Sequence, residues 1–99
     1  MTASIDHVAQ VGQVTLRYWA SARAAAGTDS DSVQVSGPVP LADLIAAARA
    51  AHPDSARFSE VIGCCSVLVG DRPVTTDDPS TVLVTPGSSV EFLPPIAGG

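Results

Sequence analysis

Apolar and polar residues alternate between positions 14 and 19, and this alternation predicts a β-strand with one buried face. Val14, Leu16 and Tyr18 fall on the inner face of that strand. Trp19 falls on the polar side. An exposed tryptophan is either an anchor packed against a loop or part of a contact surface, and the sequence leaves both interpretations open.

The next segment, Ala20 to Ala26, is rich in alanine and is followed by Gly27, which predicts one or two helical turns ended by a C-terminal glycine. A second strand is expected over Ser32 to Ser36. The run Gly37-Pro38-Val39-Pro40 then breaks the chain.

One long helix follows this break. Asp43 lies in its first turn and Arg49 near its end, and both charges suit the helix dipole. Pro53 stops it, so the expected length is about 11 to 13 residues. The residues at helical spacing are Leu41, Leu44, Ile45, Ala48 and His52.

The second half of the chain predicts short strands joined by turns. Residues 54–63 form a loop or a short helical turn. Gly70-Asp71 is a glycine-first pair typical of tight hairpins, and Pro86-Gly87 has the residue order of a type II turn. The expected strands are Cys65 to Val69, Val82 to Val84, and Val90 to Leu93, the last with Val90 and Phe92 inward and Glu91 and Leu93 outward.

This order of elements predicts an α+β domain in which one main helix covers one face of a mixed four- to five-stranded sheet. The matching architecture is the β-grasp, in which the first and last strands pair at the centre of the sheet. We expect the domain to span residues 13–94, with a flexible N-terminal arm over 1–12 and a flexible tail over 95–99.

Composition limits the classes of function. The 99 residues suffice for one domain, and the formal net charge is −5. All five basic residues are arginine. Nucleic-acid binding is disfavoured without a clustered basic face, and a basic protein partner fits better. No apolar run approaches a membrane span and no secretion signal opens the chain, so we expect a cytoplasmic protein without a membrane partner.

Cys64 and Cys65 are adjacent, a spacing that rarely closes a disulfide and matches no zinc site. We expect two reduced thiols and no bound metal. A catalytic thiol is the alternative, but neither His7 nor His52 is placed by sequence to activate one.

The last residues are the most informative ones. Pro94-Pro95 favours an extended backbone and holds the following residues away from the domain. Ile96 and Ala97 then lead to Gly98-Gly99, where the absence of Cβ lets the main chain pass through a narrow channel. Such a tail suits a carboxylate that an enzyme activates. A frayed end after a final strand is the alternative.

These segments together resemble the small subunit of molybdopterin synthase, a member of the ubiquitin-like sulfur carriers. The resemblance runs from about Val14 to Gly99, and Phe-Leu-Pro-Pro-Ile-Ala-Gly-Gly is its most specific part. The other segments that carry it are Val14 to Ala20, Arg23 with Ala24 to Gly27, Leu41 to Leu44, and Ala51-His52-Pro53.

The resemblance implies a carrier cycle. An ATP-dependent activating enzyme adenylates the Gly99 carboxylate, sulfur from a persulfide donor replaces AMP, and the thiocarboxylate enters the large synthase subunit. There its sulfur goes to cyclic pyranopterin monophosphate, and Pro94 to Gly98 thread into the partners' active sites. The chain would be a non-catalytic subunit of a heterotetramer, without a bound cofactor, because it offers no general base, metal site or nucleotide loop of its own.

The resemblance also implies that Trp19, Arg23, Val74 and Leu93 form the patch that contacts the large subunit. The alternation of inward and outward side chains along the strands independently places Trp19 and Leu93 on outward faces. Residues 75–85 are longer than is usual in the family, and Pro86-Gly87 replaces its Asp-Gly turn. Three alternatives stay open: a carrier for thiamin or cysteine synthesis, a ubiquitin-like modifier, and an interaction module with an idle tail.

Overall fold

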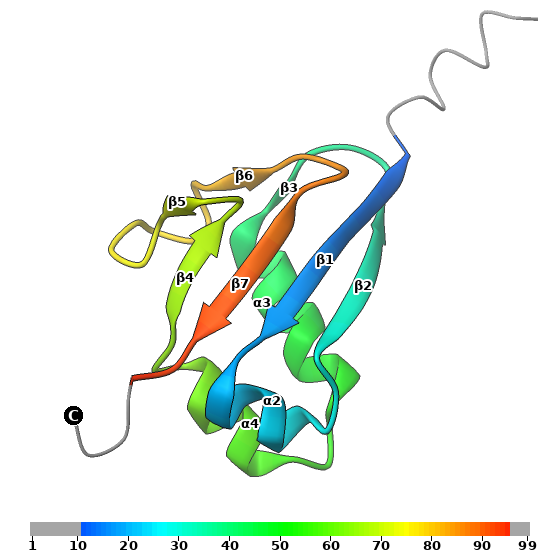
Figure 1. The fold of residues 1–99 in the computed structure, drawn as a ribbon. Coiled ribbons are helices and arrows are strands. Elements are labelled where there is room, and N and C mark those ends of the chain that lie inside the picture. Colours follow the sequence, from blue (N-terminus) through cyan, green and yellow to red (C-terminus); the bar gives the residue numbers. More distant parts are fainter. Residues whose placement is uncertain (1–10, 96–99) are drawn as a thin grey trace, which may run out of the picture.

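Parallel pairing of the first and last strands forms the centre of the sheet in the computed structural model, which describes residues 11–95 (Figure 1). The strand order is β2-β1-β7-β4-β5, and every other neighbouring pair is antiparallel. The α+β β-grasp prediction is therefore confirmed, with five strands in the main sheet. Those strands are β1 (Gly12–Tyr18), β2 (Ser30–Val35), β4 (Ser66–Val69), β5 (Arg72–Pro73) and β7 (Ser89–Leu93).

The inner face of the sheet carries the core residues that alternation predicts. Leu16 lies opposite Val90, and Tyr18 lies opposite Phe92, in the β1–β7 register. All four side chains, together with Val14, are at most 2% exposed. The phase of both central strands is thus confirmed, because a shift of one residue would turn these side chains to the other face.

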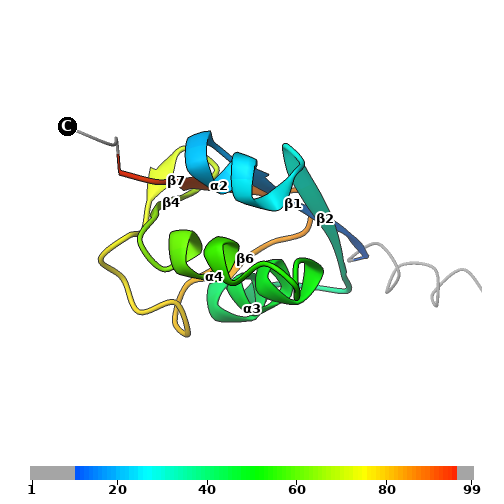
Figure 2. The ribbon, with the colours of Figure 1, turned by 90° about the horizontal axis from the view of Figure 1, so that it is seen from below.

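Besides the predicted long helix, α4 (Ala56–Ile62) also covers this face (Figure 2). α3 (Leu41–Ala51) is the predicted long helix and buries Leu44 and Ala48. α4 occupies the segment expected to be a loop or a short helical turn, and it is longer than one turn. The hydroxyl of Ser55 accepts a hydrogen bond from the backbone N–H of Phe58 at 3.0 Å, which caps this helix, and the burial of Phe58 stabilises it.

α2 (Ala20–Ala26) lies at the end of the sheet toward which β1 and β7 run (Figure 1). It ends at Gly27, which adopts φ 75° and donates its N–H to the carbonyl of Arg23. This left-handed glycine cap was predicted from the sequence. Because α2 follows β1 directly, it lies beside the point where the chain leaves β7.

The segment Gly37 to Pro40, which was expected only to break the chain, contains a short strand that the sequence analysis missed. β3 (Val39–Pro40) pairs with β6 (Leu83–Val84) in a separate two-stranded ladder. Next to it, the carbonyl of Val82 accepts the N–H of Leu41 at 2.7 Å. The long 75–85 segment thereby satisfies a donor in the first turn of α3, where proline at position 40 offers no side-chain cap.

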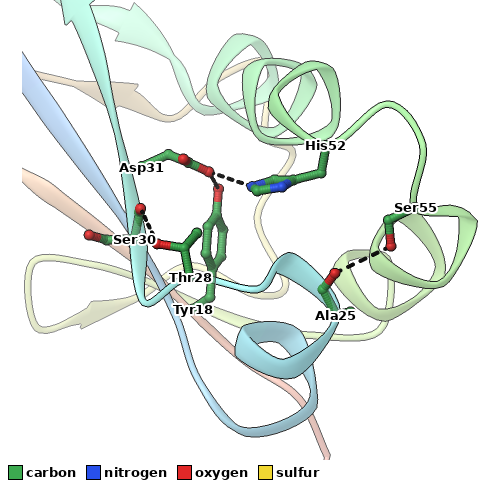
Figure 3. Close-up of polar contacts among 7 residues, drawn as sticks. All are labelled: Tyr18, Ala25, Thr28, Ser30, Asp31, His52 and Ser55. Carbon is green, nitrogen blue, oxygen red and sulfur yellow. Dashed lines mark hydrogen bonds and ion pairs between the residues drawn. The ribbon is translucent and has the colours of Figure 1, made fainter.

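A polar cluster lies inside the fold, where β1, β2 and the end of α3 meet (Figure 3). One carboxylate oxygen of Asp31 accepts a hydrogen bond from the Tyr18 hydroxyl at 2.7 Å and contacts Nε2 of His52 at 2.7 Å. The Phe58 ring packs against both aromatic partners, with ring centroids 5.1 Å from Tyr18 and 4.6 Å from His52. Burial and the Asp31 carboxylate raise the pKa of Tyr18, so its hydroxyl remains a donor at neutral pH.

We expect Asp31→Ala to lower the free energy of unfolding by about 1 to 3 kcal/mol, because it leaves the buried Tyr18 hydroxyl without its acceptor. Thermal and urea unfolding measure this loss. Asp29→Ala is the matched control. The Asp29 side chain is 81% exposed, and its removal breaks only a surface ion pair with Arg23 at 3.8 Å. Equal stability of the two variants would contradict the assigned role of Asp31.

Candidate functional site

The base of the C-terminal tail is the last described part of the chain. Pro94 and Pro95 follow β7 directly, and Pro95 is exposed. The predicted tail residues Ile96, Ala97, Gly98 and Gly99 lie outside the described residues, as does most of the predicted arm over 1–12. β1 itself begins at Gly12, one residue before the expected start of the domain.

A shallow hollow of about 230 Å³ lies beside this base. The hollow lies between α2, α4 and the Pro94-Pro95 pair. The lining residues are Ser21, Glu60, Val61, Cys64, Pro94 and Pro95. The base of the tail therefore has the hollow on its helix side and the outer face of the sheet on the other.

Among residues 11–95, no helix lies over the outer face of the sheet (Figure 2). Strand register defines which side chains share this face: Arg17 of β1 lies opposite Glu91 of β7, which in turn lies opposite Leu68 of β4. Leu93 lies opposite Ser66 in the next outward-facing row. Leu68 and Leu93 are both half-buried, so apolar surface is exposed close to the tail.

Trp19 stands at the edge of the same face, between β1 and α2. Its backbone N–H donates to the carbonyl of Phe92 at 3.2 Å, and its indole Nε1 donates to Oε1 of Glu91 at 2.9 Å. The residue is 36% exposed. Trp19 thus lies beside the end of β7, on the side predicted from the alternation, although β1 stops one residue before it.

We call Trp19, Leu68 and Leu93 the docking patch. Two of its members were predicted, and Leu68 was missed. The outward position of Leu93 together with the antiparallel register of β4 against β7 fixes Leu68 on the same face. The sequence carries only a weak signal for this residue, because all residues from Val67 to Val69 are apolar and their alternation cannot be read.

Val74, assigned to the contact surface by resemblance, does not lie on it. Its side chain is 2% exposed and belongs to the core. β5 ends at Pro73, and the N–H of Val74 donates to the carbonyl of Val67 at 3.0 Å, which turns the residue under the sheet. Burial of Val74 therefore corrects its predicted place in an exposed patch.

Arg23, also assigned by resemblance, lies one turn along α2 from Trp19. Its backbone N–H donates to the carbonyl of Trp19 at 3.3 Å. Its guanidinium is more than half exposed and lies 3.8 Å from the carboxylate of Asp29. Arg23 is therefore near the docking patch and available to solvent, and its only ion pair among the described residues is a surface pair of little strength.

The two cysteines differ in exposure. Both are free thiols, Cys64 is exposed and Cys65 is buried. Burial raises the pKa of Cys65 to about 11, with a smaller contribution from its neighbour, and its Sγ donates to the carbonyl of Val61 at 3.2 Å. His52 contacts Asp31, as described above, and is therefore engaged in the polar cluster.

We expect only one thiol of the folded chain to react rapidly with a maleimide at pH 7. Cys65 has a raised pKa, so it holds little thiolate below pH 9, whereas Cys64 is open to solvent. Intact mass measured over time should show one fast addition. Cys64→Ser should remove it and Cys65→Ser should not; rapid double labelling of the folded chain would contradict this difference.

Further ligand sites are limited in the described part of the chain. Residues 11–95 contain no cluster of three or more histidine, cysteine or acidic side chains able to hold a metal ion. Within the same range, no helix has both the length and the apolar character of a membrane span.

Comparison with known proteins gives consistent matches. A sequence profile of the ThiS family matches residues 16–99. The molybdopterin synthase sulfur carrier subunit of Aspergillus niger is 27% identical over 84 residues, which cover 85% of this chain and 91% of that protein.

Solved structures share the fold. SAMP1 from Haloferax volcanii superposes with a TM-score of 0.72 at 24% identity, over 89% of this chain and 100% of that chain. The protein–protein complex of subunits 1 and 2 of molybdopterin-converting factor from Helicobacter pylori contains a similar chain, with a TM-score of 0.58 at 20% identity, over 88% of this chain and 99% of that one. At these identities the structures establish the ubiquitin-like β-grasp fold.

Proposed function

Because the chain belongs to the ThiS family of ubiquitin-like sulfur carriers, we propose that it carries sulfur for molybdopterin synthesis as the small subunit of molybdopterin synthase. The observation that carries the proposal is the extent of the family match, which includes both the β-grasp and the Gly98-Gly99 pair. The similarity to the Aspergillus niger subunit favours molybdopterin over other products of sulfur transfer.

The chemistry begins at the Gly99 carboxylate. A free carboxylate is a poor acyl donor, whereas an acyl adenylate has AMP as a good leaving group. We propose that an ATP-dependent enzyme forms this adenylate and that sulfur from a persulfide donor then replaces AMP. Since glycine has no Cβ, the last two residues fit an active site only as wide as the main chain.

The resulting thiocarboxylate presents a sulfur nucleophile to cyclic pyranopterin monophosphate in the large subunit. The described residues contribute docking to this step. Pro94 and Pro95 favour an extended backbone at the base of the tail, and the docking patch beside them supplies apolar contact area. A large-subunit partner is supported by the Helicobacter pylori complex of subunits 1 and 2.

The absence of lysine bears on the alternative of a protein modifier. A modifier that forms chains attaches its terminus to lysine side chains of other copies, and this sequence contains none. Release of sulfur to a small molecule requires no such acceptor. The composition therefore favours the sulfur-carrier function over self-chaining.

We expect deletion of Gly99, or Gly98→Val, to abolish thiocarboxylate formation without altering the melting temperature. The reason is that the shortened chain holds its carboxylate one residue short of the adenylating site, and a Cβ at position 98 blocks the narrow approach to that site. Intact mass after incubation with ATP, an activating enzyme and a sulfur source measures the product. Gly37→Ala is the control, since an added Cβ there meets nothing within 4 Å. Normal loading of the chain that lacks Gly99 would refute the proposal.

We expect Trp19→Ala to weaken binding to the large subunit at least tenfold, about 1.4 kcal/mol, because aromatic side chains at the centre of interfaces contribute strongly. Its melting temperature should change little, since the side chain is partly exposed. Leu68→Ala should weaken binding in the same direction. Titration calorimetry beside melting curves measures both properties.

Leu83→Ala is the matched control for these variants. Leu83 is a large apolar residue that is 60% exposed, but it lies on β6, outside the docking patch. Its replacement should leave affinity unchanged. Loss of affinity equal to that of Trp19→Ala would mean that general surface hydrophobicity, rather than this patch, drives the association.

A further inference from the structure

We propose that Glu91 is a positioning residue that holds the Trp19 indole in its docking orientation before a partner arrives. This inference rests on the proposed function, because it assigns to Trp19 the role of docking anchor. Glu91 acts through Trp19, and it need not contact the partner itself.

The first support is the hydrogen bond between the two side chains. Indole Nε1 donates to Oε1 of Glu91 at 2.9 Å, across 72 positions of sequence. Hydrogen bonds to an ionised acceptor are shorter and stronger than those between neutral groups. Indole has a single N–H donor, so this bond fixes which edge of the ring faces β7 and which edge faces solvent.

The second support is a cation above the ring. The guanidinium carbon of Arg17 lies 5.2 Å from the centroid of the indole, within the range of a cation–π interaction. Arg17 lies directly opposite Glu91 in the strand register. The indole is thus held at its edge by one strand and over its face by the neighbouring strand.

The third support lies in the backbone. Trp19 is extended, with φ −118° and ψ 153°, and Ala20 then adopts φ 50°. Ala20 is the one non-glycine residue among positions 11–95 with a positive φ. Alanine is disfavoured there and persists only where its surroundings impose the conformation. The backbone bond from Trp19 to Phe92 supplies that constraint, since it fixes the chain just before the turn and with it the direction in which the Trp19 side chain leaves the backbone.

Together these contacts hold the Trp19 side chain in one orientation on the outer face of the sheet. A side chain already held in one rotamer loses less conformational entropy on binding than a free one. Folding of the domain therefore prepares the docking patch. Loss of Glu91 should leave the indole present but mobile, so binding should weaken while the area of apolar contact stays the same.

The experiment in the free chain uses the intrinsic fluorescence of Trp19, which is the single tryptophan of the sequence. Glu91→Ala should lower its fluorescence anisotropy and increase its quenching by acrylamide. Glu91→Gln keeps a carbonyl acceptor and should retain most of the native signal. Asp54→Ala, which removes an exposed carboxylate between α3 and α4, is the control and should leave the signal unchanged. An unchanged signal in Glu91→Ala, with native circular dichroism, would overturn the proposal.

A double-mutant cycle separates positioning from direct contact. Glu91→Ala should weaken binding to the large subunit about fivefold, close to 1 kcal/mol, in the native background. It should cause no further loss in a Trp19→Ala background. A fivefold loss in both backgrounds would show that Glu91 contacts the partner itself and would overturn the positioning role.

Failure of the proposed function would look different. In that case the unaltered chain would bind no large subunit and accept no sulfur, whereas the fluorescence comparison would still report on the indole. The measurement in the free chain therefore tests the role of Glu91 without assuming a partner.

Discussion

Parallel pairing of β1 with β7 is the constraint on which the rest of the structure depends. It brings residues from opposite ends of the described chain side by side, with Thr15 opposite Ser89 and Tyr18 opposite Phe92. This register fixes the point at which Pro94 and Pro95 leave the sheet. It also sets Glu91 beside Trp19. The core, the base of the tail and the docking patch therefore follow from one strand alignment.

Two adjacent aromatic residues illustrate how this alignment divides the molecule. Tyr18 points inward to the Asp31 carboxylate and is almost fully buried, whereas Trp19 points toward the outer face and bonds to Glu91. Each finds an acidic partner on its own side of the sheet. A slip of one residue would exchange their environments and leave a tyrosine outside and an indole in the core. The two carboxylates thus support the same register from opposite faces.

The elements in which apolar residues recur at a clear period were predictable from the sequence. Alternation gave the inner face of β1 and β7, and helical spacing with a following proline gave α3. The α4 segment was left open between a loop and a short helical turn because seven residues are too short for periodicity to distinguish the two, and the stability of α4 comes from packing of Phe58. β3 was missed because its two residues gain their pairing only from the distant β6.

The exposure of the candidate site residues was predictable only where a strand alternates clearly. Leu93 belongs to β7 and Trp19 directly follows β1, and both strands alternate clearly, so the exposure of the two residues could be predicted from that alternation. Leu68 and Val74 lie in or beside a short hairpin without readable alternation. The register of β4 against β7 places Leu68 on the outer face, and the bond from Val74 to Val67 accompanies the burial of Val74. The cluster of Tyr18, Asp31 and His52 could not be predicted either, because it joins three separate elements.

The docking patch is assembled from segments that lie far apart in the sequence, so it distinguishes folded from unfolded copies of the chain. Its three residues come from the end of β1, from β4 and from β7, so the patch exists only when those strands are aligned. An unfolded or misfolded copy carries the same Gly98-Gly99 sequence but lacks the assembled surface. A partner that must recognise the patch before it accepts the tail would discriminate native from non-native copies, so that docking would report completed folding.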